Sequence, residues 1–128
     1  MEEQQLILIV IDWTVVYRPV KSLETRINTK MIRHTVVFKL KHAAGSELER
    51  SFLNAARELA NIPNVEKFEC LRQVSKKNIY TFGLSMEFSS DGKYQSYNIH
   101  PDHTNFVKTR WIPEVSDFME IDYEPITP

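Results

Sequence analysis

The sequence contains a single cysteine, Cys70, and this scarcity limits what the chain can be. One cysteine cannot form a disulfide within the chain, so we expect the protein to work in a reducing compartment. Cys70 itself is expected to be a small buried apolar residue, because no basic neighbour favours its thiolate. Internal repeats and low-complexity tracts are also missing from the sequence, as in an ordinary globular protein.

Basic residues form no block or stripe. The 16 Lys and Arg residues are balanced by 17 Asp and Glu residues, for a formal net charge of -1, so no nucleic-acid partner is expected. The most apolar run, LILIVIDWTVVY, is too short to span a membrane and is interrupted by Asp12. It follows the acidic MEEQQ, where a secretory signal would be basic, so we expect a cytoplasmic protein with no membrane partner.

The chain has 128 residues. After the apolar run near its start, alternation of apolar and polar residues predicts four strands. The clearest are IRHTVVFKLK, residues 32–41, and YTFGLSMEF, residues 80–88. VEKFECLRQV, residues 65–74, and SDFMEIDYEP, residues 116–125, predict two more. The residues expected to share one face of these last two strands are Phe68, Cys70 and Val74 in the first and Met119, Ile121 and Tyr123 in the second.

Two helical regions separate the strands. In GSELERSFLNAARELANIP, residues 45–63, Ser46 and Glu49 form a capping box. The apolar stripe predicted for this helix is Leu48, Phe52, Ala55, Ala56 and Leu59. The second region starts in SSDGKYQSYN, with Ser89 or Ser90 as its cap, and is broken in two soon afterwards. The β-α-β-β-α-β order predicts an α+β, ferredoxin-like fold: a four-stranded antiparallel sheet with helices on one face.

The stretch YNIHPDHTNFVKTRW, residues 97–111, carries the candidate site. Pro101 disfavours helical geometry at His100 and suits the first turn of a new helix, so His100 should lie at a corner. The residues at helical spacing after His103 are Phe106, Val107, Arg110 and Trp111. His103 should therefore point inward, at a helix N-terminus whose dipole favours a neutral ring able to accept a proton. The alternative is that His103 only packs and hydrogen-bonds a backbone carbonyl.

A metal site is the weaker interpretation of the same histidines. His100 and His103 are spaced as two metal ligands can be, with His34 as a third. The corner at Pro101 should splay the first two, however, and no cysteine or repeated carboxylate spacing supports a site. We therefore expect no metal and no other cofactor.

Four stretches together resemble the stress-responsive dimeric α/β-barrel domain family: IRHTVVFKLK, NIPNVEKFE, YNIHPDH and IDYEP. The resemblance covers residues 31 to about 126. It implies that residues 31–128 are the domain and form a homodimer, whose two sheets close into a β-barrel with the helices outside. Residues 1–30 are then an N-terminal extension, and the β-forming residues 6–11 and 13–17 predict an extra strand there, on the core or at a sheet edge.

The resemblance also implies a site. A plant member of the family is a polyketide cyclase, which performs an intramolecular aldol condensation without a metal. Its acid/base pair falls on Tyr97 and His103, and its first-strand histidine falls on His34. By analogy, His103 would remove a proton next to a carbonyl, and the Tyr97 hydroxyl would hydrogen-bond the enolate oxygen. We expect the ligand to contact His34, Val36, Phe38, Tyr94, Phe106 and Trp111.

The sequence leaves two functions open. The first is a homodimer that binds a small apolar or carbonyl-containing molecule near His103, with aldol-cyclase or isomerase-like acid/base activity as an option. The second is a non-catalytic structural or stress-protective dimer with no ligand. Bulky Phe38 argues against a long polyketide chain. A cavity on the order of a few hundred Å³ that reaches His103 would favour the first function, and close packing the second.

Overall fold

The computed structural model describes residues 30–127. The strand predicted within residues 1–30 lies outside the described residues and stays a prediction. The elements follow the predicted order: β1 (Ile32–Leu40), α3 (Glu47–Arg57), η2 (Glu58–Asn61), β2 (Glu66–Arg72), β3 (Phe82–Phe88), α4 (Asp91–Ile99), α5 (Pro101–Phe106), η3 (Val107–Trp111), α6 (Ile112–Glu114) and β4 (Val115–Tyr123).

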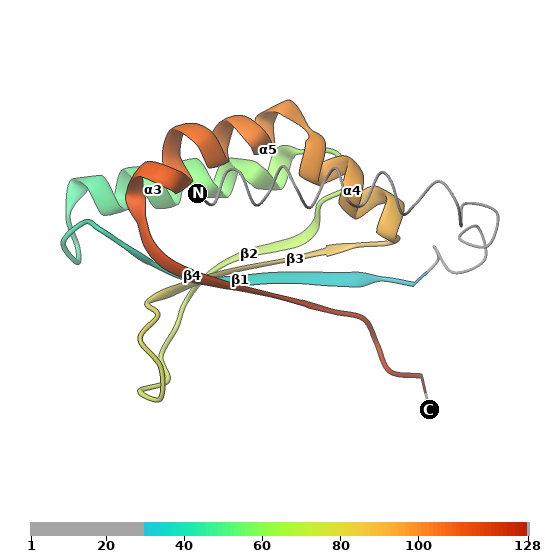
Figure 1. Cartoon of the computed structure of the whole chain (residues 1–128), viewed down its shortest axis with the longest axis horizontal. Coiled ribbons are helices and arrows are strands. Elements are labelled where there is room, and N and C mark those ends of the chain that lie inside the picture. Colours follow the sequence, from blue (N-terminus) through green and yellow to red (C-terminus); the bar gives the residue numbers. More distant parts are fainter. Residues whose placement is uncertain (1–29, 128) are drawn as a thin grey trace.

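The four strands form one antiparallel sheet in the order β2-β3-β1-β4. Figure 1 shows α3, α4 and α5 together on one face of this sheet. The ferredoxin-like prediction is therefore confirmed. None of the described helices is long and apolar enough to cross a membrane.

The core lies between the sheet and the helices, as the alternation in β1 predicts. His34, Val36 and Phe38 are buried, whereas the residues between them are less so. Phe38 is completely buried, and its ring lies 5.0 Å from that of Trp111 and 5.7 Å from those of Phe52 and Phe82. Aromatic rings bury large apolar areas, so this cluster is a main source of the fold's stability.

The first helix begins at the predicted cap, Ser46, but the capping box has a modified form. The Ser46 hydroxyl accepts a hydrogen bond from the Glu49 N–H at 3.2 Å, and the Glu49 carboxylate accepts one from the Gly45 N–H at 2.9 Å. The prediction for Leu48 is wrong, because this residue is 61% exposed. It lies in the first turn of α3, and the buried face begins one turn later, at Phe52.

The β2–β3 connection also departs from the predicted strand ends. Val74 is 82% exposed and follows the end of β2 at Arg72. The Gln73 side chain organises a loop instead, by donating to the Tyr80 carbonyl at 2.7 Å and accepting from the Ser75 N–H at 2.5 Å. These side-chain contacts replace ladder hydrogen bonds, and Tyr80 accordingly precedes β3 rather than starting it.

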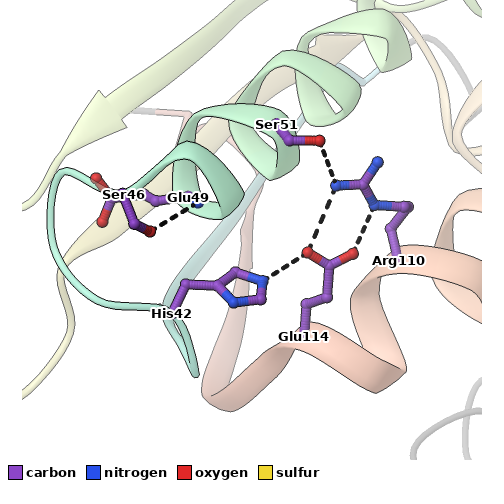
Figure 2. A network of polar contacts seen from close by, with 6 residues as sticks. All are labelled: His42, Ser46, Glu49, Ser51, Arg110 and Glu114. Carbon is purple, nitrogen blue, oxygen red and sulfur yellow. Dashed lines mark hydrogen bonds and ion pairs between the residues drawn. The ribbon is translucent and has the colours of Figure 1, made fainter.

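A polar network ties α3 to the chain that leads into β4 (Figure 2). Arg110 donates to the Glu114 carboxylate at 2.6 Å and to the Ser51 hydroxyl at 3.1 Å. His42 contacts the same carboxylate at 2.7 Å. Burial would raise the pKa of Glu114, but the hydrogen bonds from Arg110 and His42 outweigh it and hold that pKa below its usual value. The carboxylate therefore stays ionised and binds Arg110, whose guanidinium contacts Ser51 of α3.

The second face of the sheet has no cover among the described residues. Met119, Ile121 and Tyr123 share one side of β4, as predicted, and are exposed at 46%, 37% and 53%. They pair with Val37, Thr35 and Arg33 of β1, the residues that alternate with the buried ones. This apolar strip therefore lies on the face away from the helices, where a partner subunit would bury it.

Candidate functional site

The site is built around the corner at residues 99–101. Helix α4 ends at Ile99, His100 has an extended backbone (φ −63°, ψ 136°), and Pro101 begins α5. The His100 Nδ1 accepts a hydrogen bond from the Asp102 N–H at 3.0 Å and so caps the new helix. The predicted corner is confirmed, and His100 has a structural role there.

A turn of π-helix over Val107–Trp111 follows α5, and the sequence analysis missed it. The wider turn closes hydrogen bonds five residues apart and often occurs at functional sites. It brings Phe106 and Trp111, which are five residues apart, to the same buried side. Both residues also fit the α-helical spacing after His103, so the sequence carries no signal of this turn.

His103 faces the interior from α5 and packs on Tyr97, with ring centroids 4.5 Å apart. Its Nδ1 lies 3.0 Å from the Asn98 carbonyl oxygen. A carbonyl can only accept, so Nδ1 carries the proton and Nε2 of the neutral ring keeps its lone pair. Burial lowers the pKa of His103 to about 4, although the hydrogen bond to Asn98 acts in the opposite direction. The ring is therefore neutral at pH 7, with burial as the main cause. The carbonyl contact of the packing-only alternative is also present.

Tyr97 is buried, with 2% of its surface exposed, and its ring also contacts Phe88. Its hydroxyl makes no hydrogen bond with any residue that the structure describes. Burial raises the pKa of this hydroxyl well above its usual value, so it stays protonated. An O–H group without a partner in a buried place is costly, and it is available as a donor to a ligand.

His34 belongs to a hydrogen-bonded cluster with Tyr94 and Asp122. The His34 Nδ1 lies 2.6 Å from Asp122 Oδ1, and the Tyr94 hydroxyl donates to Asp122 Oδ2 at 2.8 Å. Burial and the nearby Asp122 carboxylate raise the pKa of Tyr94 well above its usual value. In the sequence, Asp122 stands out only as part of the family pattern IDYEP. Its place in the site follows from the strand register, which pairs it with His34.

Glu120 is a second acidic residue that the sequence analysis missed. It lies two residues before Asp122 on the same face of β4 and pairs with Val36. Burial raises the pKa of its carboxyl; His34 opposes this shift and Asp122 adds to it. The residue is exposed, so Glu120 lies at the edge of the site.

These groups surround a cavity of about 40 Å³. Six of the predicted residues line it: His34, Val36, Tyr97, His103, Phe106 and Trp111. Phe38 and Tyr94 do not line it: Phe38 is sealed in the aromatic core, and the Tyr94 hydroxyl contacts His34 and Asp122. The volume is enough for a few water molecules or a very small ligand. It falls far short of a few hundred Å³, so a long polyketide chain does not fit.

Within the described residues, one group has the geometry to hold a metal ion. His34, Glu120 and Asp122 each offer a ligand atom, and these atoms lie within 4.8 Å of one another. Of the histidines weighed as metal ligands from the sequence, this group contains His34 but not His100 or His103. His34 and Asp122 already share a hydrogen bond, however, and Asp122 also binds Tyr94. A metal would have to displace these contacts.

Comparison with known proteins identifies the family of this chain. The family model of the stress-responsive A/B barrel domain matches residues 32–125. The chain belongs to this family. It is 31% identical over 97 residues to a stress-response A/B barrel domain-containing protein of Arabidopsis thaliana, and the match covers 74% of this chain. The chain spans 37% of the length of that relative.

Solved structures agree with the family assignment. A dabb family protein with a ferredoxin-like fold from Mesorhizobium loti is 55% identical, with a TM-score of 0.75 over 77% of this chain and 99% of the other. A dimeric ferredoxin-like protein of unknown function from Bacteroides fragilis is 24% identical, with a TM-score of 0.59 over 74% of this chain and 96% of the other. This likeness shows that the stress-responsive A/B barrel protein shares their ferredoxin-like fold.

Proposed function

We propose that this stress-responsive A/B barrel protein is a homodimer that binds a small carbonyl compound beside His103 and transfers a proton with its own side chains. One observation carries the proposal. Tyr97, whose buried hydroxyl has no hydrogen-bond partner among the described residues, and His103, whose Nε2 is unprotonated, line the same cavity. The ring centroids of Tyr97 and His103 lie 4.5 Å apart. A hydrogen-bond donor and a proton acceptor beside one cavity are the two groups that enolate formation needs.

The chemistry follows from the two protonation states. His103 Nε2 would accept a proton from the carbon next to the carbonyl, while the Tyr97 O–H donates a hydrogen bond to the oxygen on which charge develops. With a pKa of about 4, His103 is a weak base at neutral pH. The substrate must therefore have an unusually acidic C–H, as on a carbon between a carbonyl and a second electron-withdrawing group.

The second candidate function is a structural or stress-protective dimer without a ligand. The small cavity of about 40 Å³ favours it. So does the hydrogen bond between His103 and the Asn98 carbonyl, which by itself explains an inward histidine. In that case Tyr97 and His103 serve to hold α4 and α5 on the sheet.

Proton exchange on a small ketone separates the two functions. Hydroxyacetone would be incubated with the protein in D₂O, and loss of its methylene proton signal followed by NMR. We expect the wild-type protein to speed this exchange, and Tyr97→Phe and His103→Gln each to lower the protein-dependent rate by about 100-fold or more. Tyr80→Phe, which alters a tyrosine in the β2–β3 connection, is the matched control and should keep the wild-type rate.

The same variants test the structural alternative. If wild-type protein and both variants exchange hydroxyacetone at the buffer rate while His103→Gln lowers the melting temperature, the acid/base function is refuted. A folded, dimeric variant with lost exchange would support it, and circular dichroism with sedimentation would establish both properties.

A further inference from the structure

His34 brings to the cavity a ring nitrogen that the proposed proton transfer does not use. The residue lies on β1, is 7% exposed and lines the cavity. Its Nδ1 is occupied by Asp122 Oδ1 at 2.6 Å and by the Tyr94 hydroxyl at 3.0 Å. Its Nε2 has no hydrogen-bond partner among the described residues. A buried polar atom without a partner is costly, so this nitrogen needs a ligand atom or a water molecule.

The contacts of Nδ1 decide which nitrogen of the His34 ring carries the proton. The Asp122 carboxylate can only accept hydrogen bonds, and the Tyr94 hydroxyl already donates its proton to Asp122 Oδ2 at 2.8 Å. Nδ1 is therefore the protonated nitrogen and donates to Asp122 Oδ1. In the neutral ring, Nε2 then keeps its lone pair and can only accept a hydrogen bond.

Asp122 acts on this site through its hydrogen bond to His34. The register of β1 and β4 pairs the two residues directly, and a carboxylate behind an imidazole fixes the tautomer and the orientation of the ring. The Asp122 side chain is 38% exposed, so water can solvate the carboxylate and no bound cation is required. The ring of Tyr94 packs 5.1 Å from that of His34 and supports the same orientation.

The neighbours of His34 in the cavity select the ligand. Besides the exposed Glu120 at the edge, the polar residues that line the cavity are His34, Tyr97 and His103. The cavity of about 40 Å³ has room for few atoms. A ligand that gives its carbonyl oxygen to Tyr97 must therefore carry the donor for His34 on the neighbouring carbon. A hydroxyl group is such a donor, and because it is uncharged it needs no counter-charge within a largely apolar wall.

We propose that His34, positioned by Asp122, accepts a hydrogen bond from the hydroxyl of an α-hydroxy carbonyl compound. This inference rests on the proposed function, because Tyr97 and His103 place the carbonyl end. It also meets the demand for an acidic C–H, since the carbon that bears the hydroxyl lies next to the carbonyl. The proton moves from that carbon to His103 Nε2. The electron pair of the C–H bond forms the C=C bond of the enolate, and the negative charge passes to the oxygen held by Tyr97.

Nitrogen NMR of the imidazole rings tests the positioning by Asp122. Spectra of ¹⁵N-labelled full-length protein would be recorded at pH 8, with the His34 ring assigned by correlation to its backbone. We expect the proton on Nδ1 in the wild-type protein and on Nε2 in Asp122→Asn, whose amide can keep the Tyr94 hydrogen bond on its oxygen and donate to Nδ1 from its NH₂ group. Asp117→Asn, the same substitution on β4 where it pairs with Lys39, should keep the wild-type tautomer. A proton on Nε2 in the wild-type protein, or one tautomer in both proteins, would overturn the positioning role.

A matched pair of ketones tests the class of ligand. Hydroxyacetone and 2-butanone have the same number of heavy atoms and the same ketone, and differ in a hydroxyl against a methyl group. Each would be titrated into the labelled protein. We expect the wild-type protein to bind hydroxyacetone at least tenfold more tightly than 2-butanone, and only hydroxyacetone to shift the His34 Nε2 signal. His34→Phe, which keeps a ring in the site, should abolish the preference, and Asp117→Asn should keep it.

Two results would overturn the ligand assignment. Equal affinities of the wild-type protein for the two ketones would mean that water satisfies Nε2. A preference that survives in His34→Phe would place the hydroxyl elsewhere. If His34→Phe does not fold, the wild-type spectra decide, because a His34 Nε2 signal that hydroxyacetone leaves unshifted refutes the hydrogen bond.

The outcomes also separate this inference from the proposed function. Equal binding of both ketones, with proton exchange that depends on His103, leaves the acid/base function standing and removes the role of His34. A preference for hydroxyacetone that depends on His34, without any exchange, does the reverse. Binding of neither ketone overturns both.

Discussion

Lowering the pH from 7 to 5 should destabilise the fold through His103. The pKa of this histidine is about 4 in the folded protein and about 6.5 when the chain unfolds. The folded state therefore binds fewer protons than the unfolded state between these values. By linkage, stability is lost as the pH falls through 6.5 toward 4.

The size of the effect follows from the two pKa values. One pKa unit corresponds to about 1.4 kcal/mol, so a pKa lowered from 6.5 to about 4 costs roughly 3 kcal/mol once His103 is fully protonated. Between pH 7 and pH 5 the unfolded state gains most of its proton, and the free energy of unfolding falls by about 2 kcal/mol. His103 as a residue is partly exposed, and its hydration makes this value an upper bound.

Urea unfolding measures the effect directly. Wild-type protein and His103→Gln would be unfolded at pH 7 and pH 5, at one protein concentration because a dimer's stability depends on concentration. The wild-type protein should lose up to about 2 kcal/mol more than His103→Gln between the two pH values. His100→Asn, which keeps a side chain able to cap α5, should behave as the wild type does. Equal losses for the wild type and His103→Gln would refute the lowered pKa.

Three further predictions concern the fold and its assembly. Ile121→Asp places a charge on the open sheet face and should shift the dimer to monomers in sedimentation. Leu48→Asp, on the exposed first turn of α3, should leave the dimer unchanged. An Ile121→Asp variant that stays dimeric would show that the open sheet face is not the interface. Phe52→Ala removes a fully buried ring and should cost about 3–5 kcal/mol in urea unfolding; a loss below about 1 kcal/mol would contradict its central packing. Ser90→Ala removes the cap of α4, at a cost of about 1 kcal/mol that Ser90→Asn should largely restore.

Local patterns in the sequence determined the elements and the corner of the site. Alternation with a period of two predicted the buried face of β1, because successive side chains of a strand point to opposite faces. Proline geometry placed His100 between two helices, and the cap at Ser90 follows from a hydroxyl that satisfies a free N–H. Each of these features depends on residues within one or two turns of each other.

The predictions that failed at the ends of helices and strands concern residues whose burial depends on contacts outside the local sequence pattern. Leu48 fits the apolar stripe of α3 but lies in a turn that remains exposed. Val74 fits the alternation of β2, yet the Gln73 side chain ends the strand before it. The π-helical turn at Val107–Trp111 was likewise not predictable, since Trp111 falls at the α-helical spacing after His103 and nothing local distinguishes the wider turn.

Only the tertiary structure decided the chemistry of the site. His34 and Asp122 are 88 residues apart in the chain, and the pairing register of β1 and β4 alone brings them to 2.6 Å. The same register turns Glu120 toward the cavity, and a slip by one residue would send both carboxylates to the open face. The cavity volume depends on how helices from separate segments close over the sheet. Local sequence preferences act on backbone angles and faces, whereas distances between remote side chains are set when the whole core packs.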